Sequence, residues 1–459
     1  MNIEVLKRVY FIGIGGIGMS ALAKYFLELG IEVAGYDKTP STITKGLEKQ
    51  GANITFDSAL SAVPQNFLKC DLEDILIIYT PAIPNDHPQL QYFNSGNFEF
   101  LKRAQVLGEI SKNTHTLAVA GTHGKTTTST LLAHLLYDAG IKVTGFLGGI
   151  SENYHSNYIS SGTDVVVVEA DEFDRSFLQL SPNSAAITNV DADHLDIYKT
   201  PDQLQQAFTD FSSKESLKKV FIAEGVHING IRNAQTLGVL EGANCDYQAV
   251  NIKVTEGRYT FDLQTPKGLF LDLKLAMPGL HNLRNAVTAL AMAMEYGVPI
   301  DQLKKGLLSF KGIQRRFSYQ VNTKELVYID DYAHHPTEIK ALHQAISQMH
   351  PNQKITAIFQ PHLFSRTKDF AEDFAKSLDL FDEVLLLDIY PARELPIEGV
   401  DSDWLFDLMK SKNNKRISLE NIEKEIKKRH KEKEIEILTT IGAGDIGTYV
   451  TSLKEIILS

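Results

Sequence analysis

A glycine-rich loop with a single lysine is the stretch of this sequence with the clearest chemistry. It reads Gly121-Thr122-His123-Gly124-Lys125-Thr126-Thr127, between a strand-like run and apolar residues at helical spacing. Gly121 and Gly124 permit a tight turn whose backbone amides bind phosphate, while Lys125 supplies a mobile cation. The Thr126 hydroxyl can bind Mg²⁺. The strict P-loop motif has a glycine where this chain has Val119, so the loop is a shorter variant. We predict that it binds a nucleoside triphosphate.

Carboxylates follow a strand that the sequence predicts at the centre of a parallel sheet. Consecutive valines at 165–168 precede Glu169, Asp171 and Glu172, and such a run is typical of a strand buried on both faces. Because ligands of open α/β sheets bind at the carboxyl ends of strands, Glu169 is the expected Mg²⁺ ligand or water-orienting base. Helix N-capping is a simpler alternative for Asp171 and Glu172, and we favour it for Glu172.

A histidine flanked by aspartates ends a second predicted strand. The strand-like run 185–190 leads into Asp193, His194 and Asp196, on the side of the sheet where the phosphate loop is expected. A lone histidine is usually structural, whereas neighbouring carboxylates favour a metal or phosphate site. Both interpretations of His194 stay open at this point.

Three polar residues open a predicted helix further along the chain. Pro278 and Gly279 precede His281, Asn282 and Asn285, which are neighbours on a helix because residues three or four apart share a face. Asn and His side chains can hydrogen-bond to the edge of an adenine. N-capping by Asn282 is the alternative, and from these residues alone it is the favoured one.

A second glycine turn lies near the N-terminus. Gly13, Gly15 and Gly18 follow a strand-like run and open a helical pattern, and a short second strand then ends in Asp37. This order suits a bound diphosphate, with Asp37 accepting a hydrogen bond from a ribose hydroxyl. The pattern does not distinguish a nicotinamide dinucleotide from a nucleotide-diphosphate sugar. A purely structural glycine turn is the remaining alternative.

Polar loops follow four strand-like runs in the C-terminal third. Helical segments separate these runs, so we expect parallel strands whose loops gather at one edge of one sheet. That edge would carry His334, His335, His362, Arg366, Arg393 and Asp445. Such a cluster suits an anionic or zwitterionic small molecule. The alternating Lys and Glu residues at 423–434 instead predict a solvated helix face.

Length and composition limit the classes of protein. The chain has 459 residues, which suggests about three domains. Its 46 Lys and Arg against 57 Asp and Glu give a net charge of −11, which argues against general affinity for nucleic acid. Cys70 and Cys245 are too few for a disulfide framework or a four-cysteine zinc site, and this favours a reducing, cytoplasmic compartment. The sequence contains no apolar stretch of about 18 residues, so we expect no membrane span.

Taken together, the motifs resemble those of the Mur ligases, and the resemblance covers essentially the whole chain. The matching motifs follow the family's order at 13–20, 121–127, 169–172, 193–196, 278–282, 315–317 and 331–337. The last of these, Asp-Tyr-Ala-His-His-Pro-Thr, is especially specific. Leu363 departs from the pattern, since many members carry arginine there.

The resemblance implies an α/β chain of three domains. Residues 1–108 would form a Rossmann-like domain that binds a UDP-sugar. Residues 109–314 would form a central P-loop ATPase-like domain with a mostly parallel sheet. Residues 315–459 would form a second Rossmann-like domain that binds an amino acid.

The resemblance also implies site residues by motif position. Lys125, Glu169 and His194 would be catalytic, and Thr126, Glu169 and His194 would bind metal ions. The implied ATP-binding residues are Gly121, Thr122, His123, Gly124, Lys125, Thr126, Thr127, His281, Asn282, Asn285, Arg316 and Asp331. The implied UDP-sugar-binding residues are Gly13, Gly15, Gly16, Ile17, Gly18, Asp37 and Thr80. The implied amino-acid pocket consists of Tyr332, His334, His362 and Arg366.

The implied activity is ADP-forming ligation of L-alanine to the carboxylate of UDP-N-acetylmuramic acid through an acyl phosphate, the first step of peptidoglycan stem-peptide assembly. It would use ATP and two Mg²⁺ ions, with Mn²⁺ as an alternative, in a cytoplasmic monomer or homodimer without nucleic-acid or membrane partners. The nearest rival attaches a preformed tripeptide to the same UDP-sugar. An NAD-dependent dehydrogenase leaves 121–127 and Glu169 unexplained, and a nucleotide-sensing module would bind ATP without releasing ADP.

Overall fold

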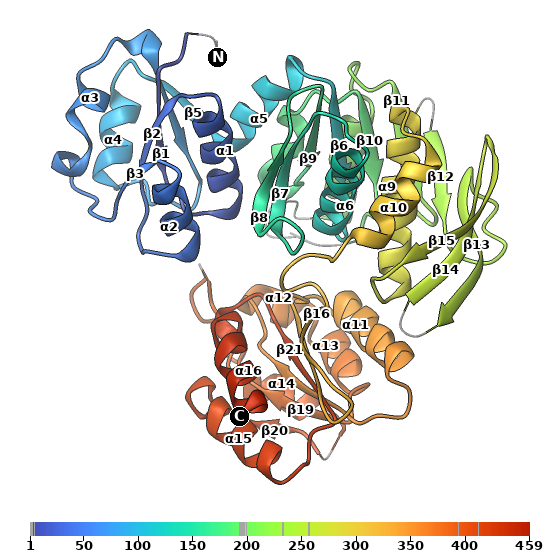
Figure 1. Cartoon of the computed structure of the whole chain (residues 1–459). Helices are drawn as coiled ribbons and strands as arrows, with labels where there is room; N and C mark the ends of the chain where they lie inside the picture. The colour runs from blue at the N-terminus through green and yellow to red at the C-terminus, as the bar shows by residue number, and fades with distance from the viewer. Residues whose placement is uncertain are drawn as a thin grey trace. The chain divides into compact units, whose positions relative to one another are not determined.

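The chain folds into three α/β domains, each built on its own sheet (Figure 1). The computed structural model describes residues 3, 5–191, 198, 200–231, 234–255, 258–392, 394–411 and 413–459. These residues form two compact units. The first consists of Met1–Val250, Asp262–Leu273 and Arg284–Phe310, and the second of Asn251–Phe261, Lys274–Leu283 and Lys311–Ser459. None of the described helices combines the length and the apolarity that a membrane crossing requires.

The N-terminal sheet has five parallel strands in the order β3-β2-β1-β4-β5. The strands are β1 Arg8–Ile12, β2 Glu32–Tyr36, β3 Asn53–Thr55, β4 Ile75–Tyr79 and β5 Glu99–Lys102. The helical segments are α1 Ile17–Glu28, α2 Thr42–Lys49, η1 Leu60–Ala62, α3 Gln65–Leu68, η2 Leu72–Asp74, α4 Pro88–Ser95 and α5 Arg103–Lys112. The strand order reverses beside β1, so a crevice is expected at the carboxyl ends of β1 and β4.

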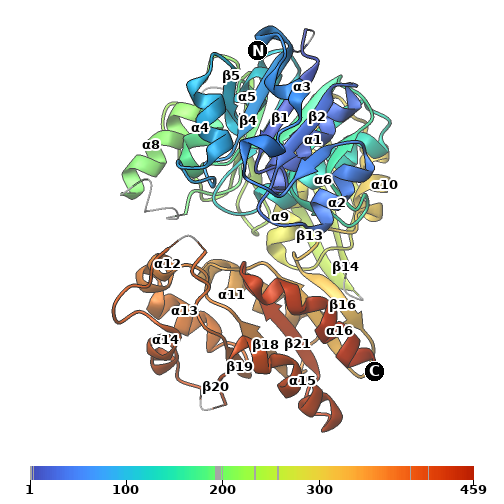
Figure 2. The ribbon, with the colours of Figure 1, turned by 90° about the vertical axis from the view of Figure 1, so that its left-hand side faces the viewer.

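Alternation along β1 explains why this sheet is covered on both faces. Tyr10 and Ile12 pack with Phe67 of α3 and Phe93 of α4, whereas Val9 and Phe11 pack with α1 and α5. Successive side chains of a strand point to opposite faces. A strand buried on both faces therefore carries apolar side chains in both directions, as β4 does and as β1 does after Arg8. Figure 2 shows these helices around the strands.

The central sheet is mixed, with ten strands in the order β15-β14-β13-β12-β11-β10-β6-β9-β7-β8. The strands are β6 Thr116–Ala120, β7 Val143–Ser151, β8 Ser156–Ser160, β9 Val165–Glu169, β10 Ser184–Ile187, β11 Lys219–Ala223, β12 Ala234–Gly238, β13 Tyr247–Thr255, β14 Arg258–Thr265 and β15 Gly268–Leu275. The helical segments are α6 Lys125–Asp138, η3 Phe173–Gln179, α8 Pro201–Ser212, α9 Leu280–Tyr296 and α10 Ile300–Ser309. The pairs β10–β6, β6–β9 and β9–β7 are parallel, so their carboxyl ends lie at one edge.

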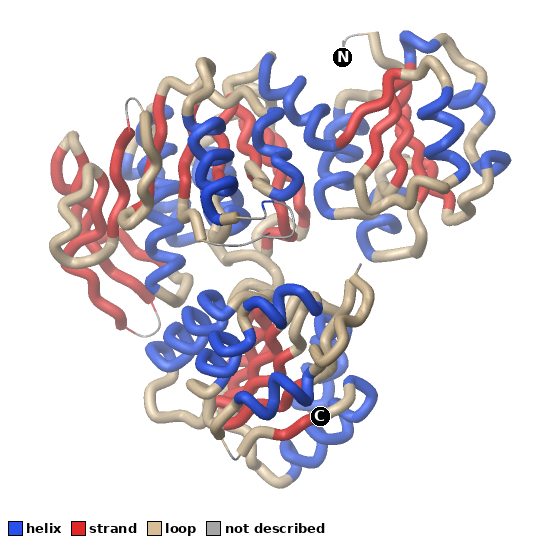
Figure 3. Tube along the Cα trace, turned by 180° about the vertical axis from the view of Figure 1, so that it is seen from behind, coloured by secondary structure: helices blue, strands red, loops and turns tan. Residues whose placement is uncertain are grey.

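The C-terminal sheet has the order β16-β17-β21-β18-β19-β20, with β16 antiparallel and the other pairs parallel. The strands are β16 Ser318–Asn322, β17 Val327–Asp331, β18 Ile355–Phe359, β19 Glu383–Leu386, β20 Lys415–Arg416 and β21 Ile437–Ile441. The helical segments are α11 Pro336–Met349, α12 Phe364–Asp369, α13 Ala371–Leu378, α14 Ser402–Leu408, η4 Leu419–Asn421, α15 Ile422–Lys431, η5 Asp445–Tyr449 and α16 Val450–Leu458. Helices α11, α13 and α14 pack on one face, and α15 and α16 on the other. Figure 3 shows helices on both sides of these strands. The predicted gathering of four strand ends at one edge is confirmed.

An aromatic cluster anchors the segment that follows the acidic end of β9. Phe177 of η3 is fully buried and stacks on Phe211 of α8 with ring centroids 4.9 Å apart. Phe208 meets the same ring edge-on at 5.2 Å. Because η3 begins directly after the carboxylates, this packing holds the backbone that carries them.

We expect Phe177→Ala to lower the free energy of unfolding by about 3–5 kcal/mol, because it removes a fully buried ring and leaves a cavity. Urea unfolding of the full chain measures the change. Tyr137→Ala is the control, since Tyr137 is 40% exposed, and it should cost less than about 1 kcal/mol. Equal losses in the two variants would contradict the anchoring role of Phe177.

Candidate active site

Glycines shape the phosphate loop between β6 and α6. Gly121 has φ +130° and Gly124, the N-cap of α6, has φ +81°, a region of backbone conformation that favours glycine. A Cβ at Gly121 would collide with the Thr188 hydroxyl, and one at Gly124 would lie 2.6 Å from Asn285 Oδ1. The loop therefore presents the amides at the start of α6 without side-chain obstruction, which is an anion-binding arrangement.

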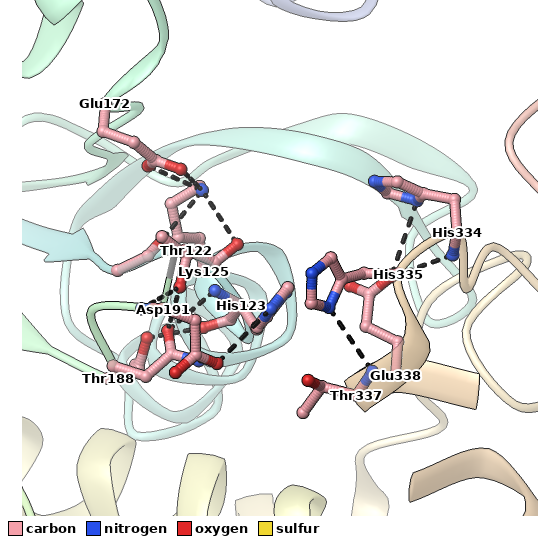
Figure 4. Close-up of polar contacts among 12 residues, drawn as sticks. Thr122, His123, Lys125, Glu172, Thr188, Asp191, His334, His335, Thr337 and Glu338 are labelled. Carbon is pink, nitrogen blue, oxygen red and sulfur yellow. Dashed lines mark hydrogen bonds and ion pairs between the residues drawn. The ribbon is translucent and has the colours of Figure 1, made fainter. Parts of the chain in front are cut away.

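The segment that follows β10 forms hydrogen bonds with this phosphate loop (Figure 4). Asn189 Oδ1 accepts from the His123 amide at 2.8 Å and from the Thr122 hydroxyl at 3.0 Å. The Thr122 hydroxyl accepts in turn from the Asp191 amide at 3.0 Å, and the Thr188 hydroxyl donates to the His123 carbonyl at 2.5 Å. In the sequence, Thr188 and Asn189 are recognisable only as part of the predicted strand at 185–190. Their role depends on the adjacency of β10 and β6, which no local motif reveals.

Lys125 forms a buried ion pair with Glu172. Its Nζ donates to the two Glu172 carboxylate oxygens at 2.8 and 2.9 Å and to the Gly121 carbonyl at 2.7 Å. Burial lowers the pKa of Lys125, but the carboxylates of Glu172, Asp171 and Glu169 outweigh burial and hold that pKa above its ordinary value. Lys125 is thus a permanent cation.

The prediction that Glu172 caps a helix is wrong. Glu172 precedes η3, but its side chain makes no capping hydrogen bond there. Its side chain is fully buried against Lys125, because a carboxylate removed from water needs a cationic partner. The shorter Asp171 accepts from the Phe173 amide at 3.2 Å instead.

Glu169 lies at the same sheet edge as the phosphate loop. It ends β9, which runs parallel to β6 with Glu169 opposite Val119. Its carboxylate packs against Gly148 of β7, where a Cβ would collide with it. Glu169 is also close enough for its charge to raise the pKa of Lys125.

The oxygen donors at this edge fit a hard divalent cation. The Thr126 hydroxyl lies at the start of α6, which follows β6. The Glu169 carboxylate lies at the end of β9, the strand next to β6 in the sheet. Within the described part of the chain, no group of three His, Cys, Asp or Glu side chains could hold a metal ion by itself. An ion bound here would complete its shell with phosphate oxygens and water, as Mg²⁺ usually does. Asp193, His194 and Asp196, and also Arg393, lie outside the described residues.

A cavity of about 800 Å³ opens at the N-terminal glycine turn. All seven residues that the resemblance assigned to the UDP-sugar line it: Gly13, Gly15, Gly16, Ile17, Gly18, Asp37 and Thr80. Asp37 Oδ2 accepts from the Gly15 amide at 2.7 Å, so this carboxylate also braces the turn. Glu169 and Asp171 line the same cavity. The cavity thus extends from the glycine turn to the acidic end of β9.

Two cavity residues were missed in the sequence. Arg103, the first residue of α5, packs over Gly18, where a Cβ would collide with its guanidinium, and its Nη2 lies 4.0 Å from Asp171 Oδ2. His87 is 8% exposed, its ring lies 4.5 Å from that of Tyr36, and both ring nitrogens lack a partner among the described residues. Burial lowers the pKa of His87. Neither residue belongs to a motif, so only the fold reveals their position.

The start of α9 corrects one prediction. The helix begins at Leu280, so Asn282 lies inside its first turn and is not the N-cap. Asn282 Nδ2 instead donates back to the Pro278 carbonyl at 2.6 Å. The His281 ring lies over Gly279, which has φ +91° and no side chain to obstruct it. In the first unit, Asn285 packs over Gly124 of the phosphate loop.

The four residues assigned to the amino-acid pocket lie together at the carboxyl edge of the C-terminal sheet. The rings of Tyr332 and His334 are 5.3 Å apart, and those of His334 and His362 are 6.0 Å apart. Arg366 Nη1 lies 3.5 Å from His362 Nδ1. Tyr390, which belongs to none of the predicted sites, stacks on His362.

His334 is neutral and has a defined tautomer. Burial lowers its pKa to about 4. Its Nδ1 lies 2.9 Å from the Tyr332 carbonyl, which can only accept, so Nδ1 carries the proton and Nε2 keeps a lone pair. His334 can therefore accept a hydrogen bond through Nε2. The adjacent His335 caps α11 by accepting from the Thr337 amide at 3.3 Å.

Asp331 and Arg316 border the same cluster. Burial raises the pKa of Asp331 to about 6, while its two carboxylate oxygens accept from the Phe317 and Ala333 amides at 2.7 and 2.8 Å. The Arg316 guanidinium lies 5.1 Å from the centroid of the Tyr332 ring. The Arg316 guanidinium is therefore a cationic group beside the predicted amino-acid pocket.

Comparisons with known proteins agree along the whole chain. The Mur ligase family catalytic domain matches 8–115, the Mur ligase middle domain matches 119–293, and the Mur ligase glutamate ligase domain matches 315–445. UDP-N-acetylmuramate–L-alanine ligase of Flavobacterium johnsoniae is 52% identical over 458 residues, which cover 100% of this chain and 99% of that protein. The same ligase of Christiangramia forsetii is also 52% identical with the same coverage.

Solved structures of similar fold cover the whole chain as well. The crystal structure of UDP-N-acetylmuramate–alanine ligase from Thermotoga maritima has a TM-score of 0.79 and 29% identity, with 98% of each chain covered. A murein peptide ligase from Psychrobacter arcticus shares the fold, with a TM-score of 0.72, 22% identity and 98% of each chain covered. With family models matched in order over three domains and relatives 52% identical over the full length, this chain belongs to the Mur ligase family.

Proposed function

We propose that the chain catalyses ATP-dependent ligation of L-alanine to the carboxylate of UDP-N-acetylmuramic acid, the first step of peptidoglycan stem-peptide assembly. The observation that carries the proposal is the full-length identity of 52% to two L-alanine ligases. The cavity that runs from the glycine turn to Glu169 supports it, because it connects a diphosphate site with a phosphoryl-transfer edge. We propose that the enzyme acts in the cytoplasm as a monomer or homodimer.

The first chemical step activates the carboxylate. A carboxylate resists attack because it is anionic and its leaving group would be an oxide. Attack of a carboxylate oxygen on the γ-phosphoryl group of ATP forms an acyl phosphate and releases ADP. In this proposal the amides of the loop and Lys125 hold the phosphates, and Lys125 offsets the charge of two approaching anions. His281, Asn282 and Asn285 would hold the adenine, with Arg316 and Asp331 near the nucleotide.

The proposed metal ligands are Thr126 and Glu169 for one Mg²⁺ ion and His194 for a second, with Mn²⁺ as an alternative. When bound, such ions supply positive charge at the transferring phosphoryl group. The role of this chain's own residues is to place hydroxyl and carboxylate oxygens at one sheet edge. The observation that supports the assignment is that Glu169 also lines the UDP-sugar cavity.

The second step forms the amide bond. The alanine nitrogen attacks the acyl carbon, a tetrahedral oxyanion forms, and inorganic phosphate leaves. Arg366 carries the charge that complements the alanine carboxylate. The amine must lose a proton before or during the attack, and the Nε2 lone pair of the neutral His334 can accept a hydrogen bond from the amine N–H and take up that proton. We propose that a domain of residues 1–108 binds the UDP-sugar, a domain of residues 109–314 binds ATP, and a domain of residues 315–459 binds the amino acid.

Phosphate release with UDP-N-acetylmuramic acid and different acceptors tests the function directly. We expect L-alanine to support turnover, and the tripeptide that a recycling ligase would use to support none above the rate without acceptor. The two acceptors are assayed at equal concentration with the same enzyme preparation. Turnover with the tripeptide but not with L-alanine would contradict the proposal and favour the recycling ligase.

Arg103 should hold the diphosphate of the UDP-sugar, since its guanidinium packs over Gly18 at the start of α1. Only Lys38 and Arg103 among the cavity residues are cationic, against Asp37, Glu169 and Asp171. We expect Arg103→Ala to weaken UDP-N-acetylmuramic acid binding about tenfold or more, the size of a lost charged hydrogen bond. Calorimetric titration measures it.

UDP-N-acetylglucosamine separates the two anionic groups of the ligand, because it has the diphosphate and lacks the carboxylate. Arg103→Ala should weaken both ligands equally. A loss confined to the muramic acid ligand would show that Arg103 binds the carboxylate instead. Arg258→Ala, at an exposed position of β14, is the matched control and should leave both affinities unchanged.

A further inference from the structure

The hydrogen bonds of Lys125 leave none of its donors for a phosphate. An ammonium group has three N–H bonds. Four acceptors surround Nζ: the two Glu172 carboxylate oxygens at 2.8 and 2.9 Å, the Gly121 carbonyl at 2.7 Å and the Thr122 carbonyl at 3.4 Å. A phosphate oxygen can bind this cation only if one of these acceptors releases it. Figure 4 shows the carboxylate and the ammonium facing each other.

Glu172 is held more firmly than Lys125. Its carbonyl oxygen accepts from the buried Tyr198 hydroxyl at 2.6 Å, and η3 follows it with Phe177 packed into the aromatic cluster. Its side chain is fully buried, whereas that of Lys125 is 11% exposed at the mouth of the loop. When the pair separates, the flexible lysine is therefore the partner that moves.

We propose that Glu172 competes with the phosphates of ATP for Lys125 and is thus a positioning residue of the ligase. Without nucleotide, Glu172 holds the ammonium group against the loop carbonyls. ATP takes at least one N–H from Glu172, and Glu172 takes it back when ADP leaves. The inference rests on the proposed function only in that ATP is the nucleotide.

The charges explain why such competition is effective. The attraction between two charges at hydrogen-bond distance is strong where water is excluded. The Glu172 carboxylate can therefore compete with a phosphate for the Lys125 ammonium group. A triphosphate is more negative than a diphosphate and attracts the lysine more strongly. Glu172 therefore weakens ADP relative to a loop with a free lysine, which favours product release.

Glu172→Gln in the full chain tests the proposal. The amide keeps the shape of the side chain and removes its charge, so the lysine becomes available to the nucleotide. We expect the Kd for ADP and for a non-hydrolysable ATP analogue to fall by about tenfold, the size of one charged hydrogen bond. In steady state, KM for ATP should fall together with kcat, because ADP leaves more slowly. Calorimetric titration and ADP-release kinetics measure the two effects.

Two further variants identify the route of the effect. Asp171→Asn removes a charge from the same segment without touching the Lys125 pair, and it should change the Kd for ADP by much less. Glu172→Gln should give no gain in a Lys125→Gln background, because there is then no ammonium group to compete for. A gain that persists in that background would mean direct repulsion between Glu172 and phosphate, and would overturn the proposal.

A purely structural ion pair predicts a different outcome. If Glu172 only neutralises a buried lysine, Glu172→Gln should bind ADP with unchanged or lower affinity, and either result would overturn the proposal. If thermal unfolding shows that Glu172→Gln does not fold, Glu172→Asp serves instead. Its shorter side chain lengthens the pair, so tighter ADP binding is again expected and unchanged or weaker binding again contradicts it. Acceptor specificity does not enter these measurements, so an error in the proposed function is detected separately.

Discussion

Compensation of charge at the carboxyl edge of the central sheet is the constraint on which the rest of the site depends. A triphosphate and a carboxylate must approach each other there, and their repulsion is strong in a site that excludes water. The positive groups at this edge are the backbone amides at the start of α6 and Lys125, and the oxygen donors are Thr126 of α6 and Glu169 of β9. Parallel neighbours in the sheet bring these groups together, since β10, β6 and β9 all end at the same edge.

Close approach of backbone segments is the second requirement. The positions where glycine admits a functional side chain recur throughout the first unit: Asp37 beside Gly15, Arg103 over Gly18, Asn285 over Gly124 and Glu169 beside Gly148. In each case a Cβ would meet the side chain that the site uses. The glycines of the turns therefore do more than permit unusual backbone angles, because they also make room for charged and polar groups from other elements.

Motifs in continuous sequence predicted the parts of the site that lie within one strand–loop–helix unit. The phosphate loop, the glycine turn of β1 and the four polar strand ends of the C-terminal sheet belong to this class, because each depends on residues close together in the chain. Glu172 was misjudged for the opposite reason. Its partner Lys125 is 47 residues away, and a carboxylate after a strand looks the same whether it caps a helix or meets a buried lysine.

Other features depend on tertiary contacts in the same way. Arg103 and His87 reach the cavity because α5 and the loop after β4 converge on the glycine turn. The predicted solvated face of α15 is correct for most of that helix, but Arg429 is buried and donates to Glu383 of β19 at 2.7 Å. Charge patterning along one helix cannot show which charged residue faces a strand. Pairing between distant elements was thus the information that the linear sequence lacked.

Oxygen transfer from substrate to phosphate tests the central claim, that this sheet edge activates a carboxylate by phosphorylation. UDP-N-acetylmuramic acid labelled with oxygen-18 in its carboxylate is incubated with ATP, L-alanine and the enzyme, and the released inorganic phosphate is analysed by mass spectrometry. An acyl phosphate requires one labelled oxygen to appear in each phosphate formed during ligation. Ligation that proceeds with unlabelled phosphate would contradict the account.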